Sequence, residues 1–258
     1  MANKVHFFKG VTLLVTHYNR SRSLEHLLQS FSNINCVFEE IVVSDDGSKP
    51  EHINYLWQLQ KQYTFRIITT SVNKGLGNNI NKGQDAVCTP FTLYVQEDFE
   101  PAHDFALHFA HALEIMQEKE DTDVVRFYAY FKYPYLKPYK HGFAQMQFAW
   151  WLPGYKKFYV YSDHPHLRRS DFLEKFGRYA EGVKGDVTEY RMMMSFLKGK
   201  GKALFYEDYR NLFFQKNSVA EPSTMKRNFW RESNNIIVHL LRESYRHFKF
   251  NYDLLFRF

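Results

Sequence analysis

The chain alternates between short apolar runs and longer segments whose apolar residues recur at helical spacing. The runs are rich in β-branched residues and predict buried strands, whereas the segments between them predict amphipathic helices. The predicted strands cover 11–17, 41–44, 65–71 and 91–95, and the predicted helices cover 21–31, a segment entered at Pro50, 77–87 and 102–117. This alternation predicts an α/β fold with a largely parallel sheet and helices on both faces.

Three polar segments lie at the C-terminal ends of predicted strands. They read VTHYNR at 15–20, SDDGS at 44–48 and QEDFEP at 96–101. Because ligands of such sheets collect outside the carboxyl ends of the strands, we expect the three segments to line one crevice. A dinucleotide-binding domain is the rival in this fold class, but its first turn should be rich in glycine. Here that turn reads THYNRSRS, and the fragment GLGNN follows the third strand instead.

The composition suits one large domain or two small ones, and we expect a single domain because no low-complexity linker divides the 258 residues. The net charge of +6 fits an anionic ligand, an anionic lipid, nucleic acid or an ordinary basic surface equally well. Cys36 and Cys88 have neither metal-ligand spacing nor a disulfide framework. The N-terminus lacks an export signal, and no run approaches the about 20 apolar residues of a spanning helix, so we expect a cytoplasmic protein.

Two adjacent carboxylates, Asp45 and Asp46, end the second predicted strand. Such a pair is costly unless a ligand, a metal or a helix N-terminus absorbs the charge. Asp-Gly is a common turn dipeptide, so we expect one carboxylate to serve the turn and the other to accept from a nucleobase N–H. The purely structural alternative is that one of them caps the next helix.

In order and spacing, VTHYNR, VVSDDGS at 42–48, NKGLGNNINKG at 73–83 and YVQEDFEP at 94–101 resemble the motifs of the family-2 glycosyltransferases. The resemblance implies the GT-A fold, a single α/β domain with a largely parallel central sheet flanked by helices. It also implies a sugar-nucleotide donor of the uridine type, Mn²⁺ or Mg²⁺, and inverting transfer to a saccharide or lipid-linked acceptor. The donor half would cover about 10–125 and the acceptor-side half about 126–225.

Within these motifs, the resemblance assigns the nucleobase to VTHYNR and to the second aspartate of SDDGS, which contacts uracil in the family. Glycines in NKGLGNNINKG permit positive φ and a helix start close to the nucleotide, although a capped turn into a helix explains the segment equally well. The family often has a basic residue where this chain has Ile80, which removes a phosphate contact. The donor positions implied are Thr16, Tyr18, Asn19, Asp45, Asp46, Asn73, Gly75, Asn81 and Glu97.

QEDFEP stands where the family has a metal-binding acidic triplet. Gln96, Glu97 and Asp98 align with the three acidic positions, and Pro101 falls where the family places a proline. A hard, oxygen-liganded cation can neutralise the departing diphosphate, and the resemblance gives this metal to Asp98. The first acid has become Gln96. A simple acidic turn at a strand end is the alternative.

The catalytic base should be a carboxylate on the acceptor side that takes the proton of the attacking hydroxyl. Aligning the stretch 185–206 on Gly201 puts Tyr190 at the family's base position, and neutral Tyr is a poor base near pH 7. We assign the base to Glu189 first and to Asp186 second. The two also have the spacing of a capping box. A non-catalytic nucleotide-sugar or glycan-binding protein on a degenerate transferase fold therefore stays open.

Aromatic and basic residues interleave over 128–172. RNA-binding surfaces look similar, but the motifs do not require nucleic acid and we expect none. Trp150 and Trp151 are the candidate acceptor platform, with at least one in the core, and Arg169 matches an acceptor-side arginine of related transferases. His164 and His166 flank a proline at a spacing more typical of a polar loop than of a metal site.

The tail predicts a basic amphipathic helix within about 226–258. Its apolar residues at helical spacing are Ile237, Leu240, Leu241, Tyr245 and Phe248, with Arg231, Arg242, Arg246 and Lys249 around them. We expect this helix to pack on the domain or on a second subunit. Peripheral attachment to anionic lipid, at the inner face of the membrane, is the sharper hypothesis.

Overall fold

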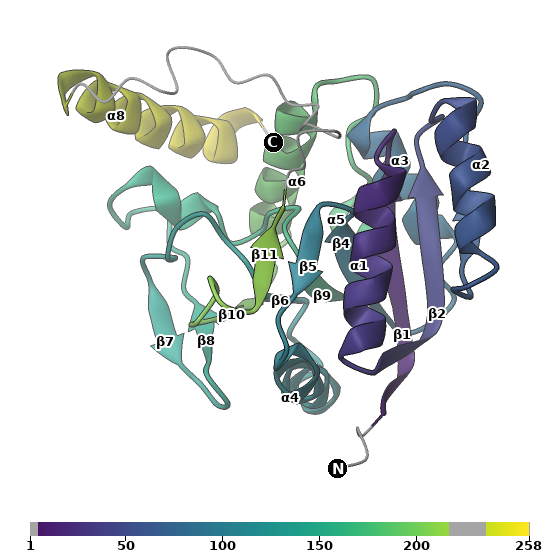
Figure 1. The fold of residues 1–258 in the computed structure, drawn as a ribbon. Coiled ribbons are helices and arrows are strands. Elements are labelled where there is room, and N and C mark those ends of the chain that lie inside the picture. Colours follow the sequence, from purple (N-terminus) through teal and green to yellow (C-terminus); the bar gives the residue numbers. More distant parts are fainter. Residues whose placement is uncertain (1–4, 217–235, 258) are drawn as a thin grey trace.

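The computed structural model describes residues 5–216 and 236–257 and is built around a nine-stranded sheet (Figure 1). The strand order is β3-β2-β1-β4-β9-β6-β10-β8-β7. Along the chain the strands are β1 (His6–His17), β2 (Cys36–Asp45), β3 (Arg66–Ile68), β4 (Phe91–Gln96), β6 (Val124–Arg126), β7 (Leu136–Pro138), β8 (Phe143–Met146), β9 (His166–Arg169) and β10 (Ala203–Tyr206).

The first four strands in this order are parallel, which confirms the predicted fold class. β9 is antiparallel to both of its neighbours, β4 and β6. β10 is parallel to β6, and β8 and β7 complete the sheet as an antiparallel pair. The strand predicted over 65–71 is shorter in the structure, where β3 ends at Ile68. The chain leaves the sheet at Thr69, whose hydroxyl donates to Asp45.

Helices cover both faces of the sheet, and each face has its own apolar core. One core joins α1 (Ser21–Asn33), α2 (Pro50–Leu59) and α4 (Phe105–Glu118) to the sheet. The other contains residues of α3 (Leu76–Asp85), α5 (Phe172–Phe176), α6 (Gly185–Lys198) and the 3₁₀ helix η1 (Tyr155–Phe158). Because β1 is buried on both faces, Leu13 contributes to the first core and its neighbour Leu14 to the second.

A second, two-stranded sheet lies beside the end of β4. β5 (Phe99–Pro101) pairs antiparallel with β11 (Phe213–Gln215). This pairing brings the chain at 215–216 onto the acidic segment, more than a hundred residues away in sequence.

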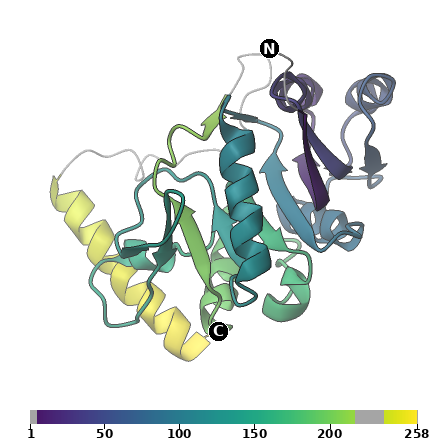
Figure 2. The ribbon, with the colours of Figure 1, turned by 90° about the horizontal axis from the view of Figure 1, so that it is seen from below.

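The C-terminal helix α8 (Ile236–Tyr252) continues as the short π-helix η2 (Asp253–Arg257). It lies at the edge of the molecule opposite α1 and α2 (Figures 1 and 2). Phe250 and Leu254 are buried in the core that contains α6 and η1. Residues 226–235 and 258 of the predicted helix lie outside the described residues, and the division of the chain into halves remains a prediction. Within the described part of the chain, no helix has the length and apolar character needed to cross a bilayer.

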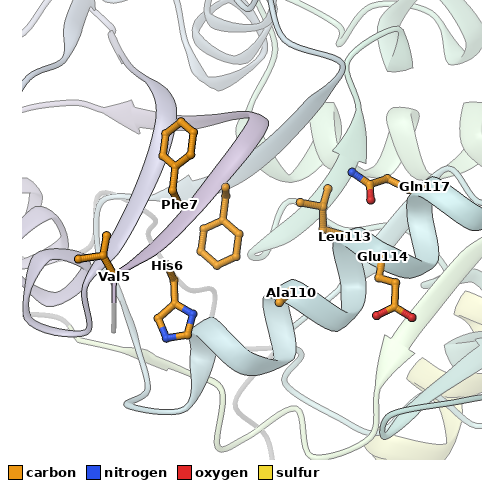
Figure 3. Close-up of a pocket in the computed structure, with 8 residues that line it drawn as sticks. Val5, His6, Phe7, Ala110, Leu113, Glu114 and Gln117 are labelled. Atoms are coloured by element: carbon orange, nitrogen blue, oxygen red, sulfur yellow. The ribbon is translucent and has the colours of Figure 1, made fainter. Parts of the chain in front are cut away.

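An open pocket of about 350 Å³ lies between the N-terminal end of β1 and α4. Figure 3 shows Val5 and His6 from the strand facing Ala110 and Leu113 of the helix. This is the opposite end of β1 from Thr16, so the pocket is separate from the predicted crevice.

Candidate donor and catalytic site

The strand register places the three predicted polar segments side by side. Thr16 of β1 pairs with Ser44 of β2 on one side and with Gln96 of β4 on the other. The segments that follow these residues therefore leave the sheet at the same edge, as the sequence predicts.

Asp45 is fully buried, and its carboxylate stabilises the turn that follows β2. It accepts hydrogen bonds from His17 Nδ1 at 2.8 Å, from the Ser48 N–H at 3.1 Å and from Thr69 Oγ1 at 2.7 Å. Burial alone would raise the pKa of Asp45, but these hydrogen bonds hold it well below its usual value. Both oxygens of Asp45 thus serve the turn and are buried, and its contact with the nucleotide remains a prediction.

Asp46 joins two of the motifs. Its two carboxylate oxygens accept from the backbone N–H groups of Lys74 and Gly75, both at 2.8 Å. Burial raises the pKa of Asp46, and the two N–H donors oppose this shift. Each carboxylate oxygen has a second lone pair, so Asp46 retains capacity to accept from a ligand. Its contact with a nucleobase remains a prediction.

In VTHYNR, only part of the predicted base-lining set reaches the surface. Tyr18 and Asn19 are partly exposed. Asn19 adopts a left-handed conformation with φ of 54°, and its Oδ1 accepts from the Lys49 N–H at 2.8 Å. Thr16 is buried with its hydroxyl 3.1 Å from the Tyr94 hydroxyl, and its contact with the base remains a prediction. Tyr18 is the residue of this segment best placed to stack on a base.

The glycines and asparagines of NKGLGNNINKG let α3 pack closely. A Cβ on Gly77 would lie 2.3 Å from the Ala180 carbonyl oxygen. Gly75 precedes α3 with φ of 87°, a conformation that favours glycine. Asn81 is buried and ties α3 to the following loop, because its amide donates to the Tyr179 carbonyl at 3.0 Å and to Glu181 at 2.8 Å. Asn81 thus stabilises the packing of α3 on this loop, and its contact with the donor remains a prediction.

Asn73 is exposed at the mouth of an open pocket of about 530 Å³. The pocket is lined by Asn73, Lys74, Gly75, Glu181, Gly182 and Val183. The backbone N–H groups of Lys74 and Gly75 donate to Asp46, so this pocket adjoins the Asp46 turn.

Asp98 lies in an ionic cluster that the sequence did not reveal. Its Oδ2 is 3.2 Å from Arg20 Nη1 and accepts from Gln215 Nε2 at 3.0 Å. Glu97 is 3.7 Å from the same guanidinium. Arg20 stands in the VTHYNR motif itself, whereas Gln215 arrives through the pairing of β11 with β5.

Asp98 also meets the requirement for a metal ligand. Its Oδ1 is buried and has no hydrogen-bond partner among the described residues. Over 5–216 and 236–257, no three His, Cys, Asp or Glu side chains gather into a site that could hold a metal on their own. Mn²⁺ and Mg²⁺ often bind through one or two carboxylates with phosphate oxygens completing the shell, so the residues present fit a cation shared with a diphosphate.

Glu189 is brought into this crevice through Asp163. The Gln96 side-chain amide donates to the Asp163 carbonyl at 3.5 Å, and the Asp163 N–H donates to Glu189 Oε1 at 3.3 Å. Burial and the charge of Glu189 raise the pKa of Asp163 to about 8. Burial also raises the pKa of Glu189, against the Asp163 N–H and Arg126, which lower it. Asp186 lies in the first turn of the same helix and raises the pKa of Glu189 further.

Tyr190 points away from the crevice. Its hydroxyl donates to Asp253 Oδ2 at 2.5 Å, and the Lys249 ammonium lies 4.5 Å from the centre of its ring. Of the alternatives left open by the sequence, Tyr190 is thus removed as a base, while Glu189 and Asp186 remain.

The predicted acceptor residues are separated in the structure. Arg169 pairs in register with Phe91, at the end of β4 opposite Gln96. Its guanidinium donates to the carbonyl of Met116 in α4 and to that of Thr122 beyond the helix, and its contact with the acceptor remains a prediction. Trp150 and Trp151 are 54% and 69% exposed, against the expectation that one is in the core. Their exposure leaves an acceptor role open.

The histidines near Asp163 are structural. His166 is buried on β9, and burial lowers its pKa well below the usual value. Burial lowers the pKa of His164 to about 3, and its ring packs edge-on against Tyr130. Many aromatic residues of 128–172 are likewise core residues, including Tyr133, Phe143, Phe158 and Tyr161.

Comparison with known proteins identifies relatives of this chain. The model of the family described as glycosyl transferase family 2 matches residues 12–177. Poly-beta-1,6-N-acetyl-D-glucosamine synthase from Staphylococcus epidermidis is 27% identical over 75 residues, which cover 29% of this chain and 18% of that protein.

Solved structures share the fold. S. aureus TarS 1-349 in complex with UDP-GlcNAc matches with a TM-score of 0.63 and 15% identity, over 96% of this chain and 76% of that chain. The mannosyltransferase PcManGT from Pyrobaculum calidifontis, in complex with GDP-Man and Mn²⁺, matches with a TM-score of 0.53 and 14% identity, over 77% and 55% of the two chains. The fold is the GT-A fold of glycosyltransferases. With most of its length matched by the family model, the chain belongs to glycosyl transferase family 2.

Proposed function

We propose that this protein transfers a sugar from a UDP-sugar to the hydroxyl of a saccharide or lipid-linked acceptor, with inversion. The observation that carries the proposal is the continuous series from Gln96 through Asp163 to Glu189. It connects the strand end that bears the acidic segment to the carboxylate proposed as base. The similarity to TarS in complex with UDP-GlcNAc makes UDP-GlcNAc the first donor to test.

The nucleotide would bind along the edge formed by the first three motifs. Tyr18 stacks on the base, Asp46 accepts from a base N–H, and Asn73 and Gly75 line the neighbouring pocket. Asp98 Oδ1 would hold Mn²⁺ or Mg²⁺ together with the donor phosphates, and Glu97 would contact the sugar or ribose of the donor. When bound, this cation neutralises the charge that develops on the departing diphosphate.

Glu189 is the proposed base. The acceptor oxygen attacks the anomeric carbon, the bond from that carbon to the diphosphate oxygen breaks, and Glu189 receives the hydroxyl proton. Glu189 is partly exposed, so an acceptor can reach it, while the Asp163 N–H fixes the orientation of its carboxylate. Asp186, one turn earlier, is the second choice. Trp150 and Trp151 are proposed to pack against acceptor sugar rings through their exposed faces.

The test is release of UDP from UDP-sugars, with Mn²⁺ and a panel of saccharide acceptors. We expect Glu189→Gln to lower kcat by at least roughly 100-fold, the usual contribution of a general base, and to leave the thermal shift caused by UDP unchanged. Glu174→Gln, an exposed acid of α5, is the matched control and keeps full activity. Equal kcat in all three proteins would refute the role of Glu189.

A non-catalytic sugar-nucleotide or glycan-binding protein is the second candidate. It is favoured by Gln96, which replaces the first acid, and by the engagement of Asp98 Oδ2 with Arg20 and Gln215. This candidate predicts that UDP-sugars raise the melting temperature while no donor and acceptor pair yields UDP. The same assay therefore separates the two functions.

A further inference from the structure

The outward side of α8 carries an apolar stripe. The stripe residues recur every three or four positions, so they share one side of the helix. They are Leu241, Tyr245, Phe248, Tyr252 and Phe256, and each is between 62% and 74% exposed. Leu255 is 51% exposed beside them. Contiguous exposed apolar side chains of this kind mark an interaction surface.

Contacts on the opposite side fix the rotation of α8. Phe250 and Leu254 are buried, with Phe250 packed edge-on against Phe158 of η1. Buried Asp253 accepts from Tyr190 and is paired with Lys249. These contacts anchor the helix to α6 and η1 and leave the stripe exposed. The helix itself lies at the edge of the molecule (Figure 2).

Cations occupy one flank of the stripe. At 100° per residue, Arg242, Lys249 and Arg246 follow one another along the same side of the stripe, whereas Ser244 and Asn251 lie along the other. Residues 241–257 contain four Arg or Lys and two Asp or Glu, and one of these acids is the buried Asp253. The helix thus presents an apolar stripe with a basic flank and an uncharged flank.

This charge pattern distinguishes two occupants. In an antiparallel pair of α8 helices related by a two-fold axis, like flanks meet, so the cations would face one another. A parallel pair would place the cations against the flank of Ser244 and Asn251, which carries no carboxylate. Asp253 already pairs with Lys249, and neither arrangement brings a further carboxylate to this flank. Anionic headgroups instead attract the net positive charge of residues 241–257, and Tyr and Phe side chains suit the boundary between headgroups and acyl chains.

We propose that α8 binds the surface of an anionic phospholipid bilayer, with the helix lying in the plane of the interface and its stripe inserted among the acyl chains. A second exposed aromatic segment lies beside it. The Lys157 ammonium donates to the carbonyls of Trp150 and Leu152 and also to Asn251 of α8, so the loop with Trp150 and Trp151 adjoins the helix.

Co-sedimentation with vesicles of phosphatidylcholine, with and without phosphatidylglycerol, tests the proposal on the full chain. We expect binding to the anionic vesicles and a loss of roughly tenfold or more in the variant Tyr245→Glu/Phe248→Glu, because both rings leave water on binding. The matched control is Trp57→Glu/Leu107→Glu, which places the same charges at exposed apolar positions on α2 and α4. The control keeps vesicle binding.

Three results would each overturn the proposal. The first is equal sedimentation of the wild type with neutral and anionic vesicles. The second is equal sedimentation of the two variants with anionic vesicles. The third is a wild-type protein that binds no vesicles and forms a dimer in light scattering, which the α8 variant abolishes. A second copy of the chain would then cover the stripe. Circular dichroism spectra that match the wild type show that each variant is folded.

Discussion

The backbone N–H of Asp163 donates to Glu189 Oε1 at 3.3 Å, and the two carboxyl groups influence each other's ionisation. This relationship brings a strand-end turn onto α6 and gives the proposed base a partner that competes with it for a proton. Two interacting acids lose their protons as a pair, so both groups shape the dependence of activity on pH.

Asp163→Asn is expected to remove the upper step of the pH profile of kcat. Burial and the charge of Glu189 raise the pKa of Asp163 to about 8, so Glu189 loses its proton first and Asp163 stays neutral below that pH. Above it, the Asp163 carboxylate places a second negative charge beside the proposed base, and the wild-type rate changes again. A neutral amide at position 163 has no proton to lose, so the variant lacks this step. Rates measured between about pH 5 and 9 check this, and an unchanged upper step would contradict it.

Folded stability should fall as pH rises over the same range. Folded Asp163 keeps its proton up to a pKa of about 8, whereas an unfolded Asp releases it near about 3.9. Between these values the folded state binds more protons than the unfolded state. The free energy of unfolding therefore decreases with pH, by on the order of a few kcal/mol. Asp163→Asn should flatten this slope in urea titrations at about pH 5 and pH 8, and a slope equal to the wild type would refute the assignment.

Tyr190→Phe is expected to leave catalysis intact and to loosen α8. The change removes the hydroxyl that donates to Asp253, a hydrogen bond to a charged group worth about 1.5–3 kcal/mol. We expect a lower melting temperature and a kcat within about twofold of the wild type, the reverse of Glu189→Gln. A large loss of kcat without a loss of stability would return Tyr190 to the site.

Asp98→Asn is expected to abolish the part of UDP binding that depends on Mn²⁺. With UDP at a hundred times its Kd, a binding-competent protein gains about 2.7 kcal/mol of stability. We expect Mn²⁺ to enhance the thermal shift caused by UDP in the wild type and to add nothing in the variant. Glu100→Gln is the control, because Glu100 lies two residues away and pairs with Lys216 at 2.8 Å. Equal enhancement in Asp98→Asn would exclude Asp98 as the metal ligand.

Gly77→Ala is expected to destabilise the fold by about 1–3 kcal/mol, the usual cost of overpacking. Its Cβ would collide with the backbone at Ala180, and the shift of α3 would disturb the adjoining donor pocket. Gly185→Ala is the matched control, since its Cβ would meet Leu76 at an ordinary 3.5 Å. Urea denaturation of both variants measures the difference, and equal stabilities would contradict the packing argument.

A motif could be predicted from the sequence where one strand and the turn that follows it form the whole motif. The turn at Asp45 and Asp46 shows the limit of that reasoning. The sequence predicted that one carboxylate serves the turn, and the structure shows that Asp45 does so and that Asp46 also binds the backbone of 74–75. That second contact depends on the loop after β3, which no local pattern specifies.

The base region was less predictable because successive side chains of α6 point in directions 100° apart. A shift of one residue in the alignment therefore changes which side chain faces the crevice. The alignment on Gly201 put Tyr190 at the family's base position, whereas the chemistry favoured Glu189. In the structure Tyr190 donates to Asp253, and Glu189 accepts from the Asp163 N–H. The position of Arg169 likewise depended on the tertiary structure. A residue at a strand end can face either edge of the sheet, and the antiparallel direction of β9 sends Arg169 to the end of β4 opposite Gln96.

The sequence by itself determined the α/β class, the order of the motifs and the edge of the sheet at which they meet, because alternating hydrophobicity and strand-end polarity are local properties. Only the tertiary structure decided which side chains face the crevice, how Arg20 and Gln215 reach Asp98, and which side of α8 stays exposed. These outcomes depend on contacts between residues far apart in the chain, and such contacts are set by packing.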